Sequence, residues 1–183
     1  MLHAISATIA ALLIQNKSDV DQQETCAYGI ETALYTLLSS AFLLLVGYCF
    51  SALLQTVILI AIYYANQTVG GGYHANSHLS CLVSMLSGLL ICLFLLSLHI
   101  PDNLFALSFI SFGYLLSNPL HLHPNKSHLQ ENAQQFIFHS RIISTASMLL
   151  LLALFQFQSE LSSSVSLGLI VSSVSRYIGT KVN

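Results

Sequence analysis

The sequence has very little charge. Only 7% of its 183 residues are Asp, Glu, Lys or Arg, whereas 55% are hydrophobic. A soluble domain usually carries about a quarter charged residues, so this chain has too little polar surface to fold in water. Residues 32–101 contain no charged side chain at all, and a helix that crosses a bilayer needs about 20 mostly apolar residues. We therefore predict an integral membrane protein.

The sequence also lacks a basic stripe, and its formal net charge is −2 at pH 7. Nucleic acid is therefore not expected as a partner. The four cysteines show no CxxC spacing, which argues against a disulfide framework. Two of them, Cys49 and Cys92, lie inside apolar runs, where a buried and inert thiol is the ordinary interpretation.

The apolar runs and their polar breaks predict an all-α, polytopic membrane protein with a single domain over residues 1–183. The N-terminal segment, residues 1–24, lacks the positive region of a signal peptide. Its apolar residues recur near the helical period, which predicts an amphipathic helix along the membrane surface: Leu2, Ile5, Ile9, Leu12 and Leu13. Six transmembrane helices are expected, at about residues 32–48, 52–64, 79–99, 104–117, 142–157 and 163–177.

The basic residues predict the orientation, because cytoplasmic segments of membrane proteins carry an excess of Lys and Arg. If both termini are cytoplasmic, all five basic residues lie on or beside cytoplasmic segments: Lys17, Lys126, Arg141, Arg176 and Lys181. This topology also brings residues 67–78 and 119–139 together at the cytoplasmic side. These two segments hold six of the eight histidines: His74, His78, His121, His123, His128 and His139.

The first segment contains a possible catalytic pair. Three glycines, Gly70 to Gly72, are followed by His74 and, seven residues later, by Cys81 at the predicted start of a span. A histidine can take the proton of a nucleophilic cysteine, and a helix N-terminus favours the thiolate. In an unbroken helix, residues seven apart are separated by about 10 Å along the axis, whereas a hydrogen bond spans about 3 Å. The pairing therefore requires that the chain bends, or that His74 precedes the helix.

Spacing alone leaves two other interpretations open. Gly70 to Gly72 can simply form a turn, with His74 as an interfacial polar residue and Cys81 as a small apolar side chain. Alternatively, His74, His78 and Cys81 can bind Zn²⁺ with a fourth ligand from His121, His123 or His128. The HExxH signature is absent, because Ala75 follows His74.

Three elements together resemble one known family. They are Gly71-Gly72-Tyr73-His74-Ala75-Asn76 followed by Cys81, then Tyr28-Gly29-Ile30-Glu31, and lastly Asn118-Pro119 followed by Pro124-Asn125-Lys126. In this order they are similar to the signature of the accessory gene regulator protein B (AgrB) family, from about Cys26 to Arg176. Family members usually carry an Arg before the glycines, where this chain has Asn66 and Gln67.

The resemblance implies a cysteine endopeptidase of the bacterial cell membrane that cuts a small quorum-sensing pro-peptide, an AgrD-like autoinducer precursor. Cys81 would be the nucleophile and His74 its general base, at the cytoplasmic face, with no metal or cofactor. A thioester on Cys81 would pass to a Cys or Ser of the peptide and close a thiolactone or lactone ring. Residues 66–81 would form the catalytic loop and helix start, and residues 118–141 a cytoplasmic loop. The possible supporting residues are Glu31, Gly71, Gly72, Asn76 and Asn118.

A different class of function is the main alternative. The chain can also be a small transporter, or a membrane protein that binds a peptide or metal without cutting it. Residues 32–101 carry no charge within the membrane, which argues against an ion-coupled carrier. Apart from a peptide substrate, membrane lipid is an expected partner. A homodimer is expected from small residues on one face of the last span, which can allow close helix packing: Ser166, Ser172 and Ser173.

Overall fold

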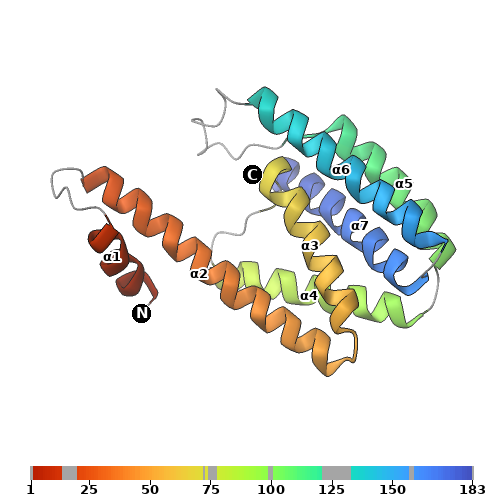
Figure 1. The fold of residues 1–183 in the computed structure, drawn as a ribbon, viewed down its shortest axis with the longest axis horizontal. Coiled ribbons are helices and arrows are strands. Elements are labelled where there is room, and N and C mark those ends of the chain that lie inside the picture. The colour runs from red at the N-terminus through yellow and green to blue at the C-terminus, as the bar shows by residue number, and fades with distance from the viewer. Residues whose placement is uncertain are drawn as a thin grey trace. The chain divides into compact units, whose positions relative to one another are not determined.

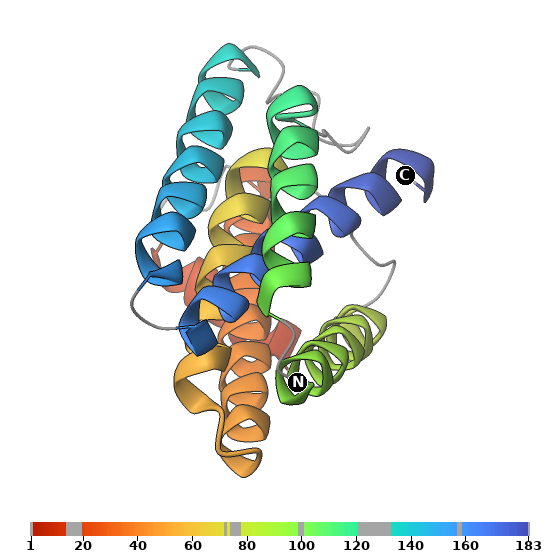
Figure 2. The ribbon, with the colours of Figure 1, turned by 90° about the vertical axis from the view of Figure 1, so that its right-hand side faces the viewer.

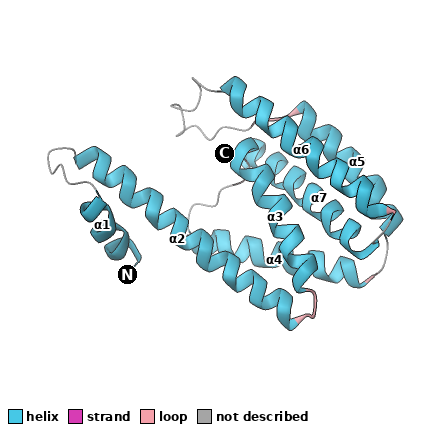
Figure 3. Ribbon diagram, viewed as in Figure 1, coloured by secondary structure: helices cyan, strands magenta, loops and turns pink. Residues whose placement is uncertain are grey.

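The computed structural model describes residues 2–13, 20–71, 73, 78–98, 101–120, 133–156 and 159–182. Within these ranges the chain is helical, with short turns and no strand (Figure 3). The helices are α1 (Leu2–Leu13), α2 (Val20–Cys49), α3 (Leu53–Gly70), α4 (His78–Ser97), α5 (Pro101–Ser117), α6 (Ala133–Phe155) and α7 (Ser159–Val182). The predicted all-α fold class is confirmed.

The chain divides into two compact units, residues 1–43 and 44–183. The first unit contains α1 and most of α2. The helix predicted in residues 1–24 is present as α1, and Ile9 and Leu12 on it are exposed. Exposed apolar side chains on such a helix are suited to contact with lipid. Its location along the membrane surface stays a prediction.

In the second unit, α7 is the central helix. It packs against α3, α4, α5 and α6 (Figures 1 and 2). Every residue from 162 to 169 is buried, although this stretch contains four serines. The apolar core joins α7 to its neighbours through Leu115, Leu151, Val165 and Leu169. A serine-rich helix is therefore enclosed by more apolar ones.

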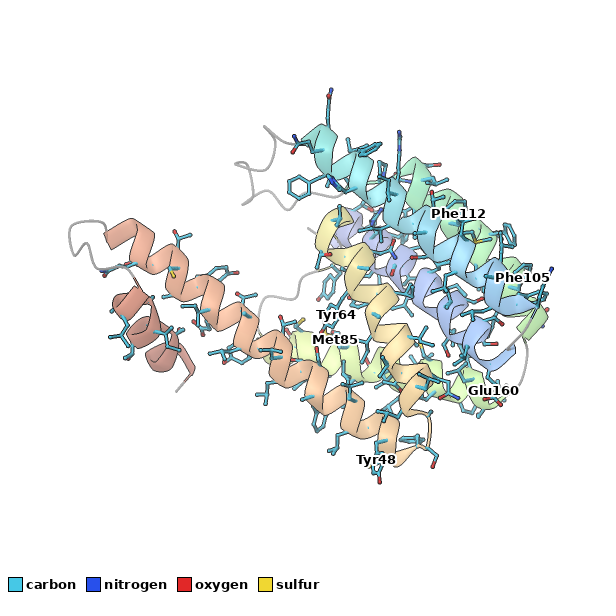
Figure 4. The ribbon with its side chains drawn as sticks, in the orientation of Figure 1. Tyr48, Tyr64, Met85, Phe105, Phe112 and Glu160 are labelled. Carbon is cyan, nitrogen blue, oxygen red and sulfur yellow. The ribbon has the colours of Figure 1, made fainter. Side chains whose placement is uncertain are left out.

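Helices α3 and α7 run parallel and approach closely. Near their N-termini, the Gln55 side-chain nitrogen lies 3.3 Å from a carboxylate oxygen of Glu160 (Glu160 is labelled in Figure 4). Further along, a Cβ added at Gly168 would lie 2.9 Å from the Cβ of Ile62. Glycine at this position allows the two backbones to approach more closely than a side chain would permit.

Helix α6 runs in the opposite direction to α3 and α5. Its C-terminal residue Phe155 stacks on Phe105 near the start of α5, with ring centroids 4.1 Å apart. Its N-terminal half meets the C-terminal half of α3, where the Ser144 hydroxyl donates to the side-chain oxygen of Asn66 at 2.9 Å. The C-terminal ends of α3, α5 and α7 and the N-terminal part of α6 therefore meet at one end of this unit.

Four helices are long and apolar enough to cross a membrane: Gln23–Cys49, Leu53–Gly70, Ser80–Ser97 and Ala133–Phe155. Asn103–Ser117 is a shorter apolar helix. These features fit a membrane protein, but they do not confirm six spans. Helix α7 differs from the others because its serines lower its hydropathy, and its neighbours cover these serines.

Two helix starts differ from the predicted spans. Helix α2 begins at Val20 and α6 at Ala133, whereas the expected spans begin at residues 32 and 142. In both cases a polar, helix-forming segment continues the helix beyond its apolar part, and hydropathy marks only the apolar part. Residues 133–141 are helical, so the loop expected over residues 118–141 is correspondingly shorter.

The serines expected to form a homodimer face are already covered within one chain. Ser166, Ser172 and Ser173 are 1%, 1% and 7% exposed. The hydroxyls of Ser172 and Ser173 donate to the carbonyls of Gly168 and Ile170. The small residues of α7 therefore serve packing inside the second unit, and this face gives no support for a homodimer.

Candidate active site

The glycine run begins at the end of α3. Gly71 adopts φ 70° and ψ −176°, and its N–H donates to the carbonyl of Gln67 at 2.9 Å. This backbone conformation is essentially restricted to glycine. Gly71 therefore ends the helix and turns the chain toward residues 72–77.

Gly70 is required for a different reason. A Cβ at this position would overlap the guanidinium of Arg176, at Nη2 and Cζ, and would lie 2.9 Å from the Ser140 hydroxyl oxygen. The last turn of α3 thus rests directly on a charged side chain of α7. No residue with a side chain fits there unless Arg176 moves.

Tyr73, on the other side of the glycines, is also held by α7. Its backbone N–H donates to the Ser175 carbonyl at 3.0 Å, and it lies 3.3 Å from the Ser175 hydroxyl oxygen. Two consecutive residues of α7, Ser175 and Arg176, therefore contact the chain on both sides of Gly71 and Gly72.

Cys81 lies in the first turn of α4 and is half-buried. The same face of α4 contacts α3, because the Tyr64 hydroxyl lies 3.8 Å from the sulfur of Met85, one turn after Cys81 (Figure 4). The Tyr63 side chain is hydrogen-bonded to Ser175 and lies near Cys81. The Cys81 thiol is thus close to the residues that hold the glycine segment.

The family described as Accessory gene regulator B matches residues 6–176, nearly the whole chain. The chain belongs to the accessory gene regulator B family. No match was found among curated proteins or among solved structures. Membership gives this AgrB-family protein a role in the accessory gene regulator system of peptide quorum sensing, and it is consistent with a processing enzyme that acts on a peptide.

The predicted site residues of this AgrB-family chain are only partly described. Gly71 and Cys81 are placed as given above, whereas Gly72, His74 and Asn76 lie outside the described residues. Glu31 is a partly buried residue of α2 in the first unit, and its supporting role stays a prediction.

Asn118, another predicted supporting residue, contributes its backbone. Its carbonyl accepts a hydrogen bond from Arg176 Nη1 at 2.8 Å, and its own side chain donates to the Tyr114 carbonyl at 3.2 Å. The side chain thus caps the end of α5, and its supporting role in the reaction stays a prediction.

The interpretation as a metal site depends on histidines outside the described part of the chain. His74, His121, His123 and His128 are not described, and neither is the His78 side chain. Among the residues that are described, no three His, Cys, Asp or Glu side chains lie close enough to hold a metal ion.

Arg176 is the residue that sequence reasoning missed. In the sequence it indicates only the topology, yet it is the largest fully buried side chain in the described structure. The family resemblance leads us to expect an Arg before the glycines, where this chain has Asn66 and Gln67. In the fold, Arg176 Nη2 donates to the Asn66 carbonyl at 3.2 Å. A guanidinium therefore does reach this place, from α7. The sequence feature that could have identified this residue is a single Arg in a serine-rich helix.

Proposed function

We propose that this AgrB-family protein is a membrane-embedded cysteine endopeptidase. It cleaves a small quorum-sensing pro-peptide through a thioester on Cys81 and promotes closure of a thiolactone or lactone ring. The observation that carries the proposal is the location of Cys81. It lies in the first turn of α4, directly after a glycine segment tied to α7, in a chain matched over residues 6–176 by the family.

The start of α4 at His78 supports the pairing that the sequence predicts. The proposal takes His74 to lie on the segment before this helix, where the separation of about 10 Å along a helix axis does not apply. Gly71 turns the chain immediately before, which supports a return of His74 toward the thiol. Cys81 lies in the first turn of α4 and is half-buried, so the proposal assigns removal of its proton to His74.

The reaction proceeds in two acyl transfers. His74 takes the Cys81 proton, and the thiolate attacks the scissile carbonyl. When the C–N bond breaks, His74 returns the proton to the leaving amine, and the N-terminal part of the peptide stays on Cys81 as a thioester. A Cys or Ser of the peptide then attacks this thioester, its proton passes through His74 to Cys81, and the ring closes.

Water must be kept from the acyl-enzyme, because hydrolysis is the downhill competitor of ring closure. Exchange of one thioester for another is nearly balanced in energy, so selectivity depends on which nucleophile reaches the carbonyl first. A site beside apolar helices with few charges suits this need.

Product analysis tests the proposal. The chain is co-expressed with the small open reading frame encoded beside it, and the precursor mass is followed by mass spectrometry. We expect the precursor to disappear and a product to form that is lighter than the linear acid by one water. A precursor that stays intact, or that accumulates in vesicles uncut, would instead support a transporter or binding protein.

A further inference from the structure

We propose that Arg176 is a positioning residue for the Cys81 reaction, because it joins the end of α3, which precedes residues 71–77, to the end of α5, which precedes residues 119–132. This inference rests on the proposed function. It adds a role for α7, which is far in sequence from the glycine run. Arg176 does not touch the reacting atoms in this account; it acts through the backbone segments that it holds.

The contacts of Arg176 converge from three helices. Nη1 donates to the Asn118 carbonyl at 2.8 Å, and it lies 3.4 Å from the Leu115 carbonyl oxygen and 3.5 Å from the Ser140 hydroxyl oxygen. Nη2 donates to the Asn66 carbonyl at 3.2 Å. The side chain is 1% exposed. One guanidinium therefore connects α3, α5 and α6 to α7.

The charge is located where helix ends provide electron-rich groups. The Leu115 carbonyl belongs to the last turn of α5 and the Asn118 carbonyl follows directly, whereas the Asn66 carbonyl lies one turn before the end of α3. The last carbonyls of a helix lack intrahelical donors and carry the negative end of its dipole, so a cation there is stabilised. All four acceptors are carbonyl or hydroxyl oxygens. Within the described residues, Nε of Arg176 has no hydrogen-bond partner.

A buried arginine is costly to desolvate, and packing alone would be served by an apolar side chain. The presence of an arginine at this junction therefore indicates that the position of the joined segments matters. The planar guanidinium can bond in several fixed directions at once, which a lysine ammonium cannot reproduce. Arg176 is suited to fix three helix ends in one arrangement.

Arg176 and its neighbour hold both sides of the glycine turn. Gly70 lies against the guanidinium, and the Tyr73 N–H is bonded to Ser175. Tyr73 directly precedes His74, so the position of the proposed base depends on α7. Because Tyr63 is hydrogen-bonded to Ser175 and lies near Cys81, α7 is connected through Tyr63 to the surroundings of the proposed nucleophile.

The inference is tested with Arg176→Gln, Arg176→Lys and Gly70→Ala, the last of which places a methyl group where the guanidinium lies. Arg141→Gln, at an exposed position on α6, is the matched control. Precursor cleavage is measured as kcat and KM in detergent or vesicles, together with melting temperature. We expect kcat to fall about 10²-fold in all three variants, the typical effect of a small misplacement of reacting groups. KM should change less than kcat, and Arg141→Gln should behave as the wild type.

A second readout separates positioning from mere loss of stability. The rate of Cys81 alkylation by iodoacetamide is recorded against pH in folded protein. A displaced His74 should change this pH profile in Arg176→Lys and Gly70→Ala, whereas a purely structural role would lower the melting temperature and leave the profile unchanged. In the Arg176→Ala background, Gly70→Ala should lower kcat little further, because the added methyl group then occupies the space that the guanidinium has left.

Wild-type kcat and an unchanged alkylation profile in Gly70→Ala and Arg176→Lys would overturn the inference. The proposed function fails separately, if Cys81 variants still cleave the precursor. If Cys81 is essential while the Arg176 and Gly70 variants are fully active, only the positioning role is wrong.

Discussion

Replacing Cys81 with alanine or serine is expected to abolish cleavage of the precursor peptide. The thiolate is the group that attacks the carbonyl, and a serine hydroxyl in the same place is far less acidic and remains protonated. Loss of a peptidase nucleophile costs on the order of 10⁶-fold in kcat, so no product should be detected by mass spectrometry.

Cys92→Ala is the matched control for this change. Cys92 lies on the same helix but is 2% exposed and packs in the core with Leu59 and Leu167. We expect full cleavage at equal membrane levels of protein. Processing by both Cys81 variants at the wild-type rate would contradict the role of Cys81 as nucleophile.

His74→Ala is expected to have the next largest effect. A general base typically contributes about 10²–10⁴-fold, so cleavage should fall by that factor while the chain still inserts. His139→Ala is the control, because His139 is an exposed residue of α6 whose Nδ1 lies 2.6 Å from the Gln135 carbonyl oxygen.

The His74 variant also has a chemical signature. If His74 takes the Cys81 proton, the rate of Cys81 alkylation should lose its dependence on histidine titration in His74→Ala, and added imidazole should restore part of the cleavage. An unchanged rate of cleavage in His74→Ala, or an equal loss in His139→Ala, would contradict a specific pairing.

The presence of the helices and their order along the chain were predictable from the sequence, because each apolar run is visible in a short stretch of residues. The low charge predicted a membrane protein, and each predicted span overlaps one helix from α2 to α7. Helix ends were less predictable. The segments that precede the apolar parts of α2 and α6 are polar, and their helical structure extends beyond what hydropathy can detect.

The central position of α7 was not predictable, because it depends on contacts that are distant in sequence. Its serines were interpreted as a face for a second copy of the chain. In the fold, hydroxyls bond to carbonyls within the helix, as Ser164 does to Glu160 and Ser172 to Gly168, and the surrounding helices cover them. Composition alone cannot show which helix the others enclose.

In the candidate site, too, features within one short segment were predictable and contacts between distant segments were not. The glycine run and Cys81 were identified from spacing and family resemblance, and Gly71 has the backbone conformation that explains a glycine. Arg176 could not be connected to them, since 106 positions separate it from Gly70 in the sequence. Only the fold brings its guanidinium against that glycine.

The most direct test of the central claim is the intact mass of the wild-type chain after rapid mixing with precursor and acid quench. A thioester on Cys81 predicts a mass increase equal to the N-terminal part of the peptide, located on Cys81 by fragmentation and removed by hydroxylamine. The increase should be absent in Cys81→Ala. Cleaved precursor without any such adduct, or an adduct that persists in Cys81→Ala, would contradict covalent catalysis by Cys81.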